Sequence, residues 1–557
     1  MDRRVDARGA ALSIRVGRGT AWLFLAPALA FLAVFLAYPL QSILGESFAR
    51  GGGFGPLTEG TYFAERAWFT LWQALVSAGI TLVLAMPVAY VLACYEFRGK
   101  AIFEALITVP FVLPTIVVAV AFTALLGPGG LANDWLMRLP GIDEPPIQLM
   151  NSFWAILIAH VFYNVALAAR IISVSWARVD SRLEDAAAML GASRAGTFWT
   201  VTLPLLRTPI IAAGSLVFLF CFTSFGVVLI LGGPQYSTIE TEIYRETLFL
   251  FRLPLAATLA LLQLIATFGA MWINSALQRS VVQPGASRRR PNRWTLGRRA
   301  FAGLVIAVAA LVTIVPMAAL AERSVHSGAG YTFDYYRSLD DNVRGQVLFV
   351  APIEAVRNSV TFAVLTMLLA VPLGTLAAHG VTRLRSAPME ALIQLPLGVS
   401  GVTLGLGFLI TFDAPPLNLR ASPALVVIAH SLVAMPFVAR TVAAQLRSLD
   451  PRLREAASML GASPLRRFLA VDLALTWRSM AAGAVFAFAI SMGEFGATLL
   501  IARPEYPTIP LAIFRYLGQP GALNYGQALA MATILMVVTA VGFIVIDRLR
   551  FREYGAF

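Results

Sequence analysis

Long apolar runs separated by short polar segments make up almost all of this 557-residue chain. Each run is close to the roughly 20 residues that a helix needs to cross a bilayer. Only helices and closed barrels satisfy their backbone groups in lipid, and these runs are continuous rather than alternating, so they predict helices. We expect twelve spans, at about 21–44, 69–94, 103–126, 152–173, 208–231, 254–277, 299–320, 356–379, 388–411, 423–443, 478–501 and 525–547.

Composition supports a membrane protein, because 58% of the residues are hydrophobic and only 13% are charged. An average soluble domain has roughly 25% charged residues. The net charge is +13, but the arginines lie in short segments between the apolar runs, where orientation signals belong. We therefore expect a lipid bilayer as the surrounding medium and no nucleic-acid partner.

The charged residues between spans alternate in sign along the chain. Basic segments precede the first span and occupy 174–207, 278–298 and 444–477, among others. The segments between them are mixed or acidic, and one of these, after the fifth span, carries Glu240, Glu242 and Glu246. The positive-inside rule then predicts a multi-pass protein of the bacterial inner membrane with both termini in the cytoplasm.

The two halves of the sequence contain a repeat. Residues 180–193 read DSRLEDAAAMLGAS and residues 450–463 read DPRLREAASMLGAS, identical at ten of fourteen positions with an offset of 270. Both copies lie in basic segments, so an even number of spans separates them and the halves form a parallel duplication. We predict an all-α integral membrane protein with two six-helix halves, 1–278 and 299–557, joined by a cytoplasmic linker at 279–298.

Each copy of the repeat contains a short helix-forming stretch rich in alanine and leucine. A glycine follows each stretch, Gly191 in the first copy and Gly461 in the second, and glycine is the usual left-handed cap after the last turn of a helix. The pattern predicts two short helices on the cytoplasmic face whose small side chains allow another surface to approach. An ordinary amphipathic connector is the alternative, but it does not explain two copies at equivalent positions.

The repeat resembles the EAA coupling loop of the permeases of binding-protein-dependent ABC importers. The matching residues are Asp185, Ala186, Ala187, Gly191, Leu203 and Pro204 in the first copy and Glu455, Ala456, Ala457 and Gly461 in the second. Asp185 replaces the usual glutamate, and Ala474 stands where the second copy would have the proline. The resemblance implies a type I ABC importer permease fold and docking of one ATPase subunit on each copy.

The same resemblance implies which partners perform the chemistry. No phosphate-binding G-x-x-x-x-G-K-[ST] loop occurs in the chain, so ATP and Mg would be used by a separate ATPase, present in two copies. An extracytoplasmic substrate-binding protein would deliver the cargo. We expect no catalytic residue, no metal site and no cofactor in this chain.

The segments 221–248 and 491–518 resemble the fused permeases for thiamine and ferric iron, and the thiamine permeases most. Glu494 lies within an apolar run, and an intramembrane carboxylate is a functional candidate. With Phe495, and with Ser224 and Phe225 in the other half, it is a candidate lining of the cargo pathway. A carboxylate beside aromatic rings suits a flat organic cation. It also suits ferric iron, or a purely structural interhelical hydrogen bond.

His160 and His430 occupy equivalent positions in the two halves. Neither has a neighbouring ligand at metal-binding spacing, so duplicated packing or hydrogen bonding is the favoured interpretation. A twelve-helix secondary transporter and a polytopic membrane enzyme are the rival classes. The first does not explain the repeated loops, and the second requires clustered polar groups that the spans lack.

Overall fold

The computed structural model describes residues 19–49, 53–58, 60–279, 294–327, 330–341, 347–413 and 415–554. Most of the predicted linker 279–298 lies outside these ranges. The chain divides into two compact units, which are described separately. The first-half unit comprises residues 50–337 and 520–536, and the second-half unit comprises Met1–Ala49, Ser338–Gln519 and Val537–Phe557.

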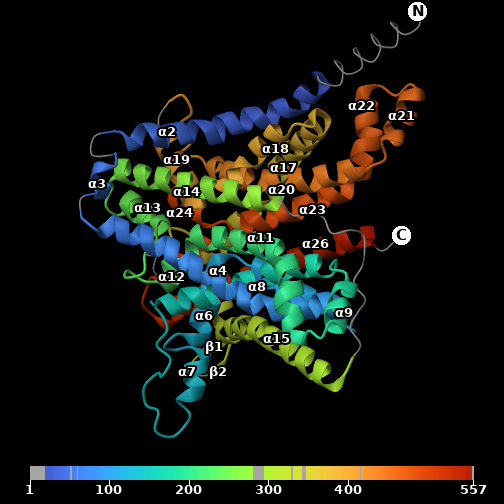
Figure 1. Cartoon of the computed structure of the whole chain (residues 1–557). Coiled ribbons are helices and arrows are strands. Elements are labelled where there is room, and N and C mark those ends of the chain that lie inside the picture. Colours follow the sequence, from blue (N-terminus) through green and yellow to red (C-terminus); the bar gives the residue numbers. More distant parts are fainter. Residues whose placement is uncertain are drawn as a thin grey trace, which may run out of the picture. The chain divides into compact units, whose positions relative to one another are not determined.

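In its described residues, the regular structure of the first-half unit is helical apart from one hairpin, whose two strands are each two residues long (Figure 1). Its elements are α3 (Gly55–Thr58), α4 (Tyr62–Cys94), α5 (Lys100–Val112), α6 (Thr115–Leu126), α7 (Leu131–Leu136), α8 (Phe153–Trp176), α9 (Ser181–Met189), α10 (Arg194–Thr197), η2 (Phe198–Thr202), α11 (Leu203–Phe222), α12 (Gly226–Leu231), α13 (Ile239–Leu248), α14 (Leu253–Arg279), α15 (Leu296–Ser324), β1 (His326–Ser327), β2 (Gly330–Tyr331) and α16 (Asp334–Arg337).

The second-half unit repeats the order of elements from α4 to α13, without a counterpart of α7 among its described residues. It begins with the span Gly19–Ser47, which includes η1 (Ala33–Ala37) and α2 (Tyr38–Ser47). There follow α17 (Pro352–Leu384), α18 (Ala387–Gln394), η3 (Leu395–Gly398), α19 (Gly401–Thr411), α20 (Ala424–Ser448), α21 (Pro451–Met459), α22 (Pro464–Arg467), η4 (Phe468–Leu473), α23 (Ala474–Gly493), α24 (Gly496–Ile501) and α25 (Ile509–Leu517); α26 (Ala522–Tyr554) is shared by both units.

The described residues contain eleven helices long and apolar enough to cross a membrane, and twelve when one bent pair is counted as a span. The prediction of an all-α protein with about twelve spans is confirmed. The bent pair is Ala387–Gly398 with Gly401–Thr411, whose axes differ by 90°. The prediction of one continuous helix over 388–411 is therefore wrong. Ser400 ends the break by capping α19, since its side chain accepts a hydrogen bond from the Thr403 backbone N–H.

Three further predicted spans are also interrupted. The run 103–126 breaks between α5 and α6, where Pro114 precedes the second helix with an extended backbone. The runs 208–231 and 478–501 break at residues 223–225 and 494–495, between α11 and α12 and between α23 and α24. Hydropathy averaged over a span does not detect these breaks, because the few polar residues in them, such as Ser224 and Glu494, are flanked by apolar residues on both sides.

The first span of each sequence half packs in the unit formed mainly by the other half. In the first-half unit, α15 contacts α4, α5 and α6. In the second-half unit, the Gly19–Ser47 span packs on α19, where a Cβ at Gly407 would meet Pro39 at 3.0 Å and Ile43 at 3.1 Å. The compact units thus exchange their first helices relative to the sequence halves.

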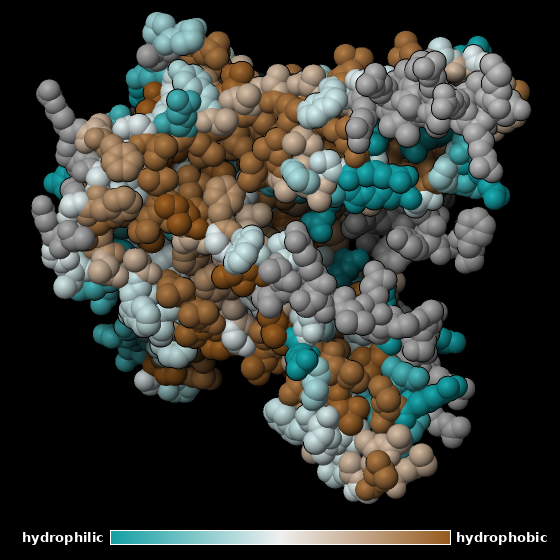
Figure 2. Space-filling view, turned by 45° about the horizontal axis from the view of Figure 1, so that its top comes forward, coloured by the Kyte–Doolittle hydropathy of each residue, from teal (hydrophilic) through white to brown (hydrophobic). Residues whose placement is uncertain are grey.

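Each unit has a core of three helices that contact one another: α4, α8 and α11 in the first-half unit, and α17, α20 and α23 in the second-half unit. Small residues allow this close packing, as they do in other membrane proteins. A Cβ added at Gly374 of α17 would lie 2.7 Å from the Val438 side chain of α20. Large apolar side chains remain on the outside, and Figure 2 shows hydrophobic surface over wide areas of the visible face.

Candidate functional site

The two copies of the repeat form two short helices of equal length, α9 and α21, here called the repeat helices. Each begins at an aspartate cap, since the Asp180 and Asp450 side chains accept hydrogen bonds from the backbone N–H of the second residue after them. Each ends before a glycine with positive φ, +87° at Gly191 and +77° at Gly461. The predicted helices and their caps are confirmed.

Neither repeat helix buries a single residue in the structure. The most exposed apolar side chains lie at their carboxyl ends: Met189 is 84% and Leu190 89% exposed, and Met459 and Leu460 are 89% and 87% exposed. An exposed Met-Leu pair at both equivalent positions indicates a surface that another protein covers. Sequence reasoning missed this pair, although it lies within the repeated sequence segment. The predicted residues Ala186 and Ala456 are exposed on the same helices.

A continuous helical segment leads from each repeat helix into the apolar part of the chain. Leu203 and Pro204 lie in the first turn of α11, directly after the π-helical segment η2. The equivalent segment of the second half, η4, is also π-helical and leads into α23 at Ala474. A π-helical turn inside a helix is rare and often marks a functional position. The missing proline in the second copy does not prevent the helix from starting at the same place.

A side-chain contact joins each repeat helix to the π-helical segment that follows it, but the chemistry differs between halves. In the first half, Thr202 Oγ1 donates a hydrogen bond of 2.9 Å to Glu184 Oε1. In the second half, Arg454 Nε donates to Asp472 Oδ1 at 2.6 Å, and Arg383 of α17 donates to Asp472 Oδ2 at 3.1 Å. The fully buried carboxylate of Asp472 is thus paired with two arginines.

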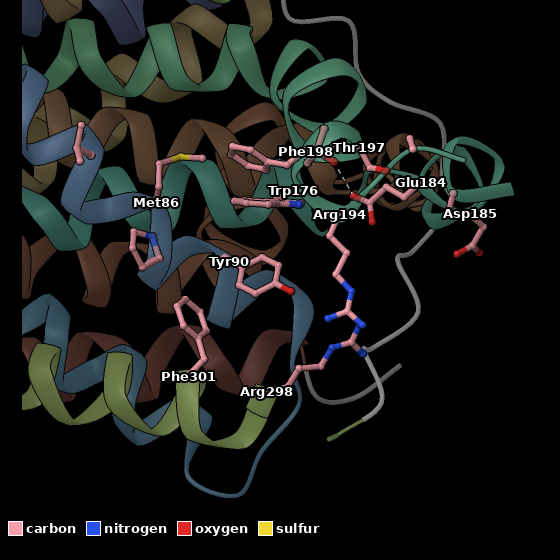
Figure 3. A pocket seen from close by; sticks show the side chains of 15 residues that line it. Met86, Tyr90, Trp176, Glu184, Asp185, Arg194, Thr197, Phe198, Arg298 and Phe301 are labelled. Carbon is pink, nitrogen blue, oxygen red and sulfur yellow. Dashed lines mark hydrogen bonds between the residues drawn. The ribbon is translucent and has the colours of Figure 1, made fainter. Parts of the chain in front are cut away.

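A pocket of about 630 Å³ lies beneath the first repeat helix within the first-half unit (Figure 3). Its lining comes from α4, α8, α9, α10, η2 and α15. The lining residues are Val83, Met86, Pro87, Tyr90, Trp176, Glu184, Asp185, Ala188, Ala192, Arg194, Thr197, Phe198, Thr202, Arg298 and Phe301. Sequence reasoning did not find it, because its walls come from four stretches that lie far apart in the sequence, within 83–90, at 176, within 184–202 and within 298–301.

The two symmetric histidines form buried hydrogen bonds at the breaks in the fifth and eleventh spans. His160 Nε2 lies 2.9 Å from Ser224 Oγ, and His160 Nδ1 lies 3.2 Å from Ser77 Oγ. His430 Nδ1 lies 2.7 Å from Ser491 Oγ, and its Nε2 lies 2.8 Å from Thr498 Oγ1. The prediction of duplicated hydrogen bonding is confirmed. No group of three potential metal-ligating side chains occurs among the described residues.

Glu494 occupies the break before α24, not the middle of a helix as expected. Its Oε1 accepts a hydrogen bond from the Ala497 backbone N–H at 2.9 Å. Its Oε2 accepts from the Thr498 backbone N–H at 3.0 Å and from Thr498 Oγ1 at 2.7 Å. The carboxylate therefore caps the first turn of α24. Both oxygens are engaged within the protein, which favours the structural interpretation of this residue.

The aromatic neighbours of these breaks face the protein interior. Phe225 is buried against Tyr244 of α13, with ring centroids 5.7 Å apart, and Phe495 is buried against Phe514 of α25 at 5.6 Å. The four predicted residues therefore lie at equivalent breaks, Ser224 and Phe225 in the first half and Glu494 and Phe495 in the second. Their role in a cargo pathway stays a prediction.

The acidic residues that were expected in a loop after the fifth span lie instead in the buried helix α13. Glu240, Glu242 and Glu246 are all 1% exposed or less. Glu242 Oε1 accepts a hydrogen bond from the Tyr62 hydroxyl at 2.8 Å, and Arg66 and Arg245 approach the same carboxylate at 3.9 and 3.5 Å. The expectation of an acidic loop at this position is wrong, because the segment folds back and is capped by Thr238.

Comparison with known families identifies the class of protein that this arrangement represents. Residues 85–247 and 370–553 match the family described as binding-protein-dependent transport system inner membrane component. The matches cover more than half of the chain and fall once in each half. The chain therefore belongs to this family, and it is a multi-pass inner-membrane permease of an ABC importer with both permease halves fused.

Several curated relatives align with nearly the whole chain. The thiamine transport system permease protein ThiP of Brucella abortus (strain 2308) is 28% identical over 531 residues, covering 94% of both chains. The protein of the same name from Haemophilus influenzae is 29% identical over 532 residues, covering 91% of this chain and 93% of the relative. The one from Salmonella typhimurium is 26% identical over 535 residues, covering 93% and 94%.

Proposed function

We propose that this chain is the permease subunit of an importer for thiamine or its phosphates. The observation that carries the proposal is the full-length similarity to several proteins named as thiamine transport permeases, which extends through both halves. A single shared domain would support only the general class. Co-linearity over both halves and the breaks within them supports the same kind of cargo.

The repeat helices are the docking sites for two copies of an ATPase subunit in this proposal. Their exposed Met-Leu pairs supply apolar contacts, and their alanines leave room for a neighbouring surface. The ATPase binds and hydrolyses ATP with Mg, so this chain binds no cofactor of its own. The repeat helices and both termini face the cytoplasm, as the arginine-rich segments around them indicate.

Motion of the ATPase subunits reaches the interior of the permease along one path in each half. In the first-half unit, α9 is joined through Thr202 to η2, and the continuous helix Arg194–Phe222 leads from there to the break beside His160. In the second-half unit, α21 is joined through Asp472 to η4 and α23, which ends at Glu494. Closure of the ATPase dimer thus shifts the two breaks, which would open or close the pathway.

The test is cargo-stimulated ATP hydrolysis by the complete complex in lipid. The permease, its ATPase and its substrate-binding protein are reconstituted, and thiamine, thiamine diphosphate and ferric iron are compared. We expect stimulation by a thiamine compound and its loss in the Ala186→Glu, Ala456→Glu double variant. If only ferric iron stimulates hydrolysis, the cargo is iron and not a thiamine compound. Ion-driven uptake that persists without an ATPase would overturn the proposal.

A further inference from the structure

The pocket beneath α9 combines side chains of opposite charge. Arg194 of α10 and Arg298 of α15 line it from two different elements, and Figure 3 shows both side chains extending into the space between these elements. Glu184 and Asp185 of α9 belong to the same lining, and Glu184 Oε1 accepts a hydrogen bond from Thr202 Oγ1 there, whereas Figure 3 shows the Asp185 carboxylate apart from both arginines. A pocket with both arginine and carboxylate groups suits a ligand that carries both signs of charge, and arginine suits phosphate oxygens in particular.

Aromatic rings form the inner wall of the same pocket. Tyr90 lies between Trp176 and Phe301, with ring centroids 5.4 and 6.1 Å away, and Trp176 lies 6.2 Å from Phe198. Such faces stack on planar rings and attract cationic ones. A wall of this kind is more specific than an anion site of arginines alone, since it adds a surface for a flat heterocycle.

The equivalent region of the second half carries a cluster of charged side chains. Glu184, Thr202 and Phe198 correspond to Arg454, Asp472 and Phe468 at the offset of 270. There Arg454 and Arg383 both pair with Asp472, and the Arg383 guanidinium stacks at 4.5 Å on the Phe24 ring. Phe24 also contacts Phe468, with ring centroids 5.0 Å apart. The two halves therefore differ in the side chains at these equivalent positions, an ion-pair cluster in the second half and a hydroxyl–carboxylate hydrogen bond in the first.

We propose that the pocket beneath α9 is a regulatory site for a small planar cation that carries a phosphate group. The arginines bind the phosphate, the aromatic wall stacks on the ring, and the Glu184 carboxylate balances its positive charge. This proposal rests on the proposed function, because it assigns regulation to a pocket beneath an ATPase docking helix. A ligand here contacts α9, η2 and α15 at once. It holds the repeat helix α9 against its neighbours and so slows the ATP-driven transport cycle.

Binding is tested first on the purified permease alone in phosphatidylcholine nanodiscs, so that the result does not depend on the ATPase or on the identity of the cargo. Thiamine diphosphate is the probe, with thiamine and inorganic pyrophosphate as half-ligands, and Trp176 fluorescence and calorimetry report binding. We expect saturable binding of thiamine diphosphate at least tenfold tighter than of either half-ligand. If pyrophosphate binds as tightly as thiamine diphosphate, the aromatic wall does not contribute to binding and that part of the proposal is wrong. If thiamine diphosphate shows no saturable binding, the proposed site is refuted.

Two variants locate the binding. Arg194→Gln with Arg298→Gln should weaken thiamine diphosphate at least tenfold and leave thiamine unchanged. Glu184→Arg with Thr202→Asp copies the Arg454–Asp472 pair of the second half and places a third arginine in the lining, so it should abolish binding of the cation, while circular dichroism melting verifies that the protein still folds. Binding that survives both variants places the ligand elsewhere and refutes the proposal. Nanodiscs with phosphatidylglycerol form the lipid arm: if they block the probe, the phosphate of a lipid is the occupant and the small-molecule assignment is wrong.

Regulation is tested in the complete complex. Thiamine diphosphate added on the ATPase side should lower cargo-stimulated hydrolysis in the wild type and have no effect in the Arg194→Gln, Arg298→Gln variant. If the ligand binds to the permease but hydrolysis is unchanged, the regulatory role is refuted. If the complex shows no cargo stimulation at all while binding persists, the proposed function fails and the binding site stands.

Discussion

Asp472 and Arg454 form a salt bridge of 2.6 Å between the one buried residue of the π-helical segment η4 and the second repeat helix, at the positions where the first half has the Thr202–Glu184 hydrogen bond. The two repeat helices are therefore fixed to the permease by interactions of different strength. A charge pair with a fully buried carboxylate depends strongly on both partners, whereas a hydroxyl–carboxylate bond between the buried Thr202 and the partly buried Glu184 involves only one charge and depends less on them.

Removing the charge at Asp472 should cost far more stability than removing the hydroxyl at Thr202. Asp472→Asn leaves Arg454 and Arg383 without their counter-charge, and we expect a loss of about 3 kcal/mol, as for other broken buried pairs. Thr202→Val should cost only about 1–2 kcal/mol. Thermal unfolding in lipid nanodiscs provides the comparison. Equal shifts in the two variants would show that the ion pair adds nothing to the anchoring of the second repeat helix.

The exposed tips of the repeat helices should carry the ATPase contact. Leu190→Glu and Leu460→Glu each place a charge where the partner covers an apolar side chain, and we expect each variant to lose most of its co-purifying ATPase. Both leucines are almost fully exposed in the permease, so unfolding of the permease alone should not change. Normal ATPase recovery with both variants combined would refute docking at these tips.

Glu494 should be required for stability rather than for cargo charge. Glu494→Ala leaves the backbone N–H groups of Ala497 and Thr498 without partners, which costs about 1–3 kcal/mol for each buried group. Glu494→Gln keeps a carbonyl oxygen as acceptor and should retain most of the stability. The decisive measurement is the KM for transport in the glutamine variant. An unchanged KM supports the capping role, whereas a rise of tenfold or more would show that Glu494 contacts the cargo.

The sequence predicted the helical architecture, the duplication and the repeat helices, because each depends on local patterns. The length of an apolar run predicts a membrane-spanning helix, and the alanine-rich stretch that ends before Gly191 predicts a short helix with a glycine cap. The breaks at Ser224 and Glu494 were missed, since an apolar run looks the same whether the helix continues or is recapped by a side chain. The pocket was also missed, because Tyr90, Arg194 and Arg298 come together only through tertiary packing.

Gly191 should be needed because of its backbone conformation alone. Its φ of +87° is left-handed, and no atom lies within 4 Å of a Cβ added there, so strain is the only cost of a side chain. Gly191→Ala should destabilise the end of α9 by about 1–2 kcal/mol, and Gly191→Asn by less, since asparagine tolerates this region. Hydrogen exchange of residues 181–190 is the measurement, with Gly196→Ala in the adjacent helix as a control without positive φ. Faster exchange in the alanine variant than in the control is expected, and identical exchange would contradict the cap.

Glu246 should destabilise the folded protein at neutral pH. Its side chain is 1% exposed, and no hydrogen bond reaches its Oε2 from the described residues. Burial raises the pKa of Glu246 above its usual value of 4.5, although Arg252 and Arg245 act in the opposite direction and Glu242 adds to the rise. A raised carboxyl pKa in the folded state means that the wild type loses stability as the pH rises through the interval between the unfolded and the folded pKa. Glu246→Gln removes this loss, so its melting temperature should exceed that of the wild type at pH 8 and approach it at pH 4.5. A difference that does not vary between these two pH values would show that ionisation of Glu246 is not the cause.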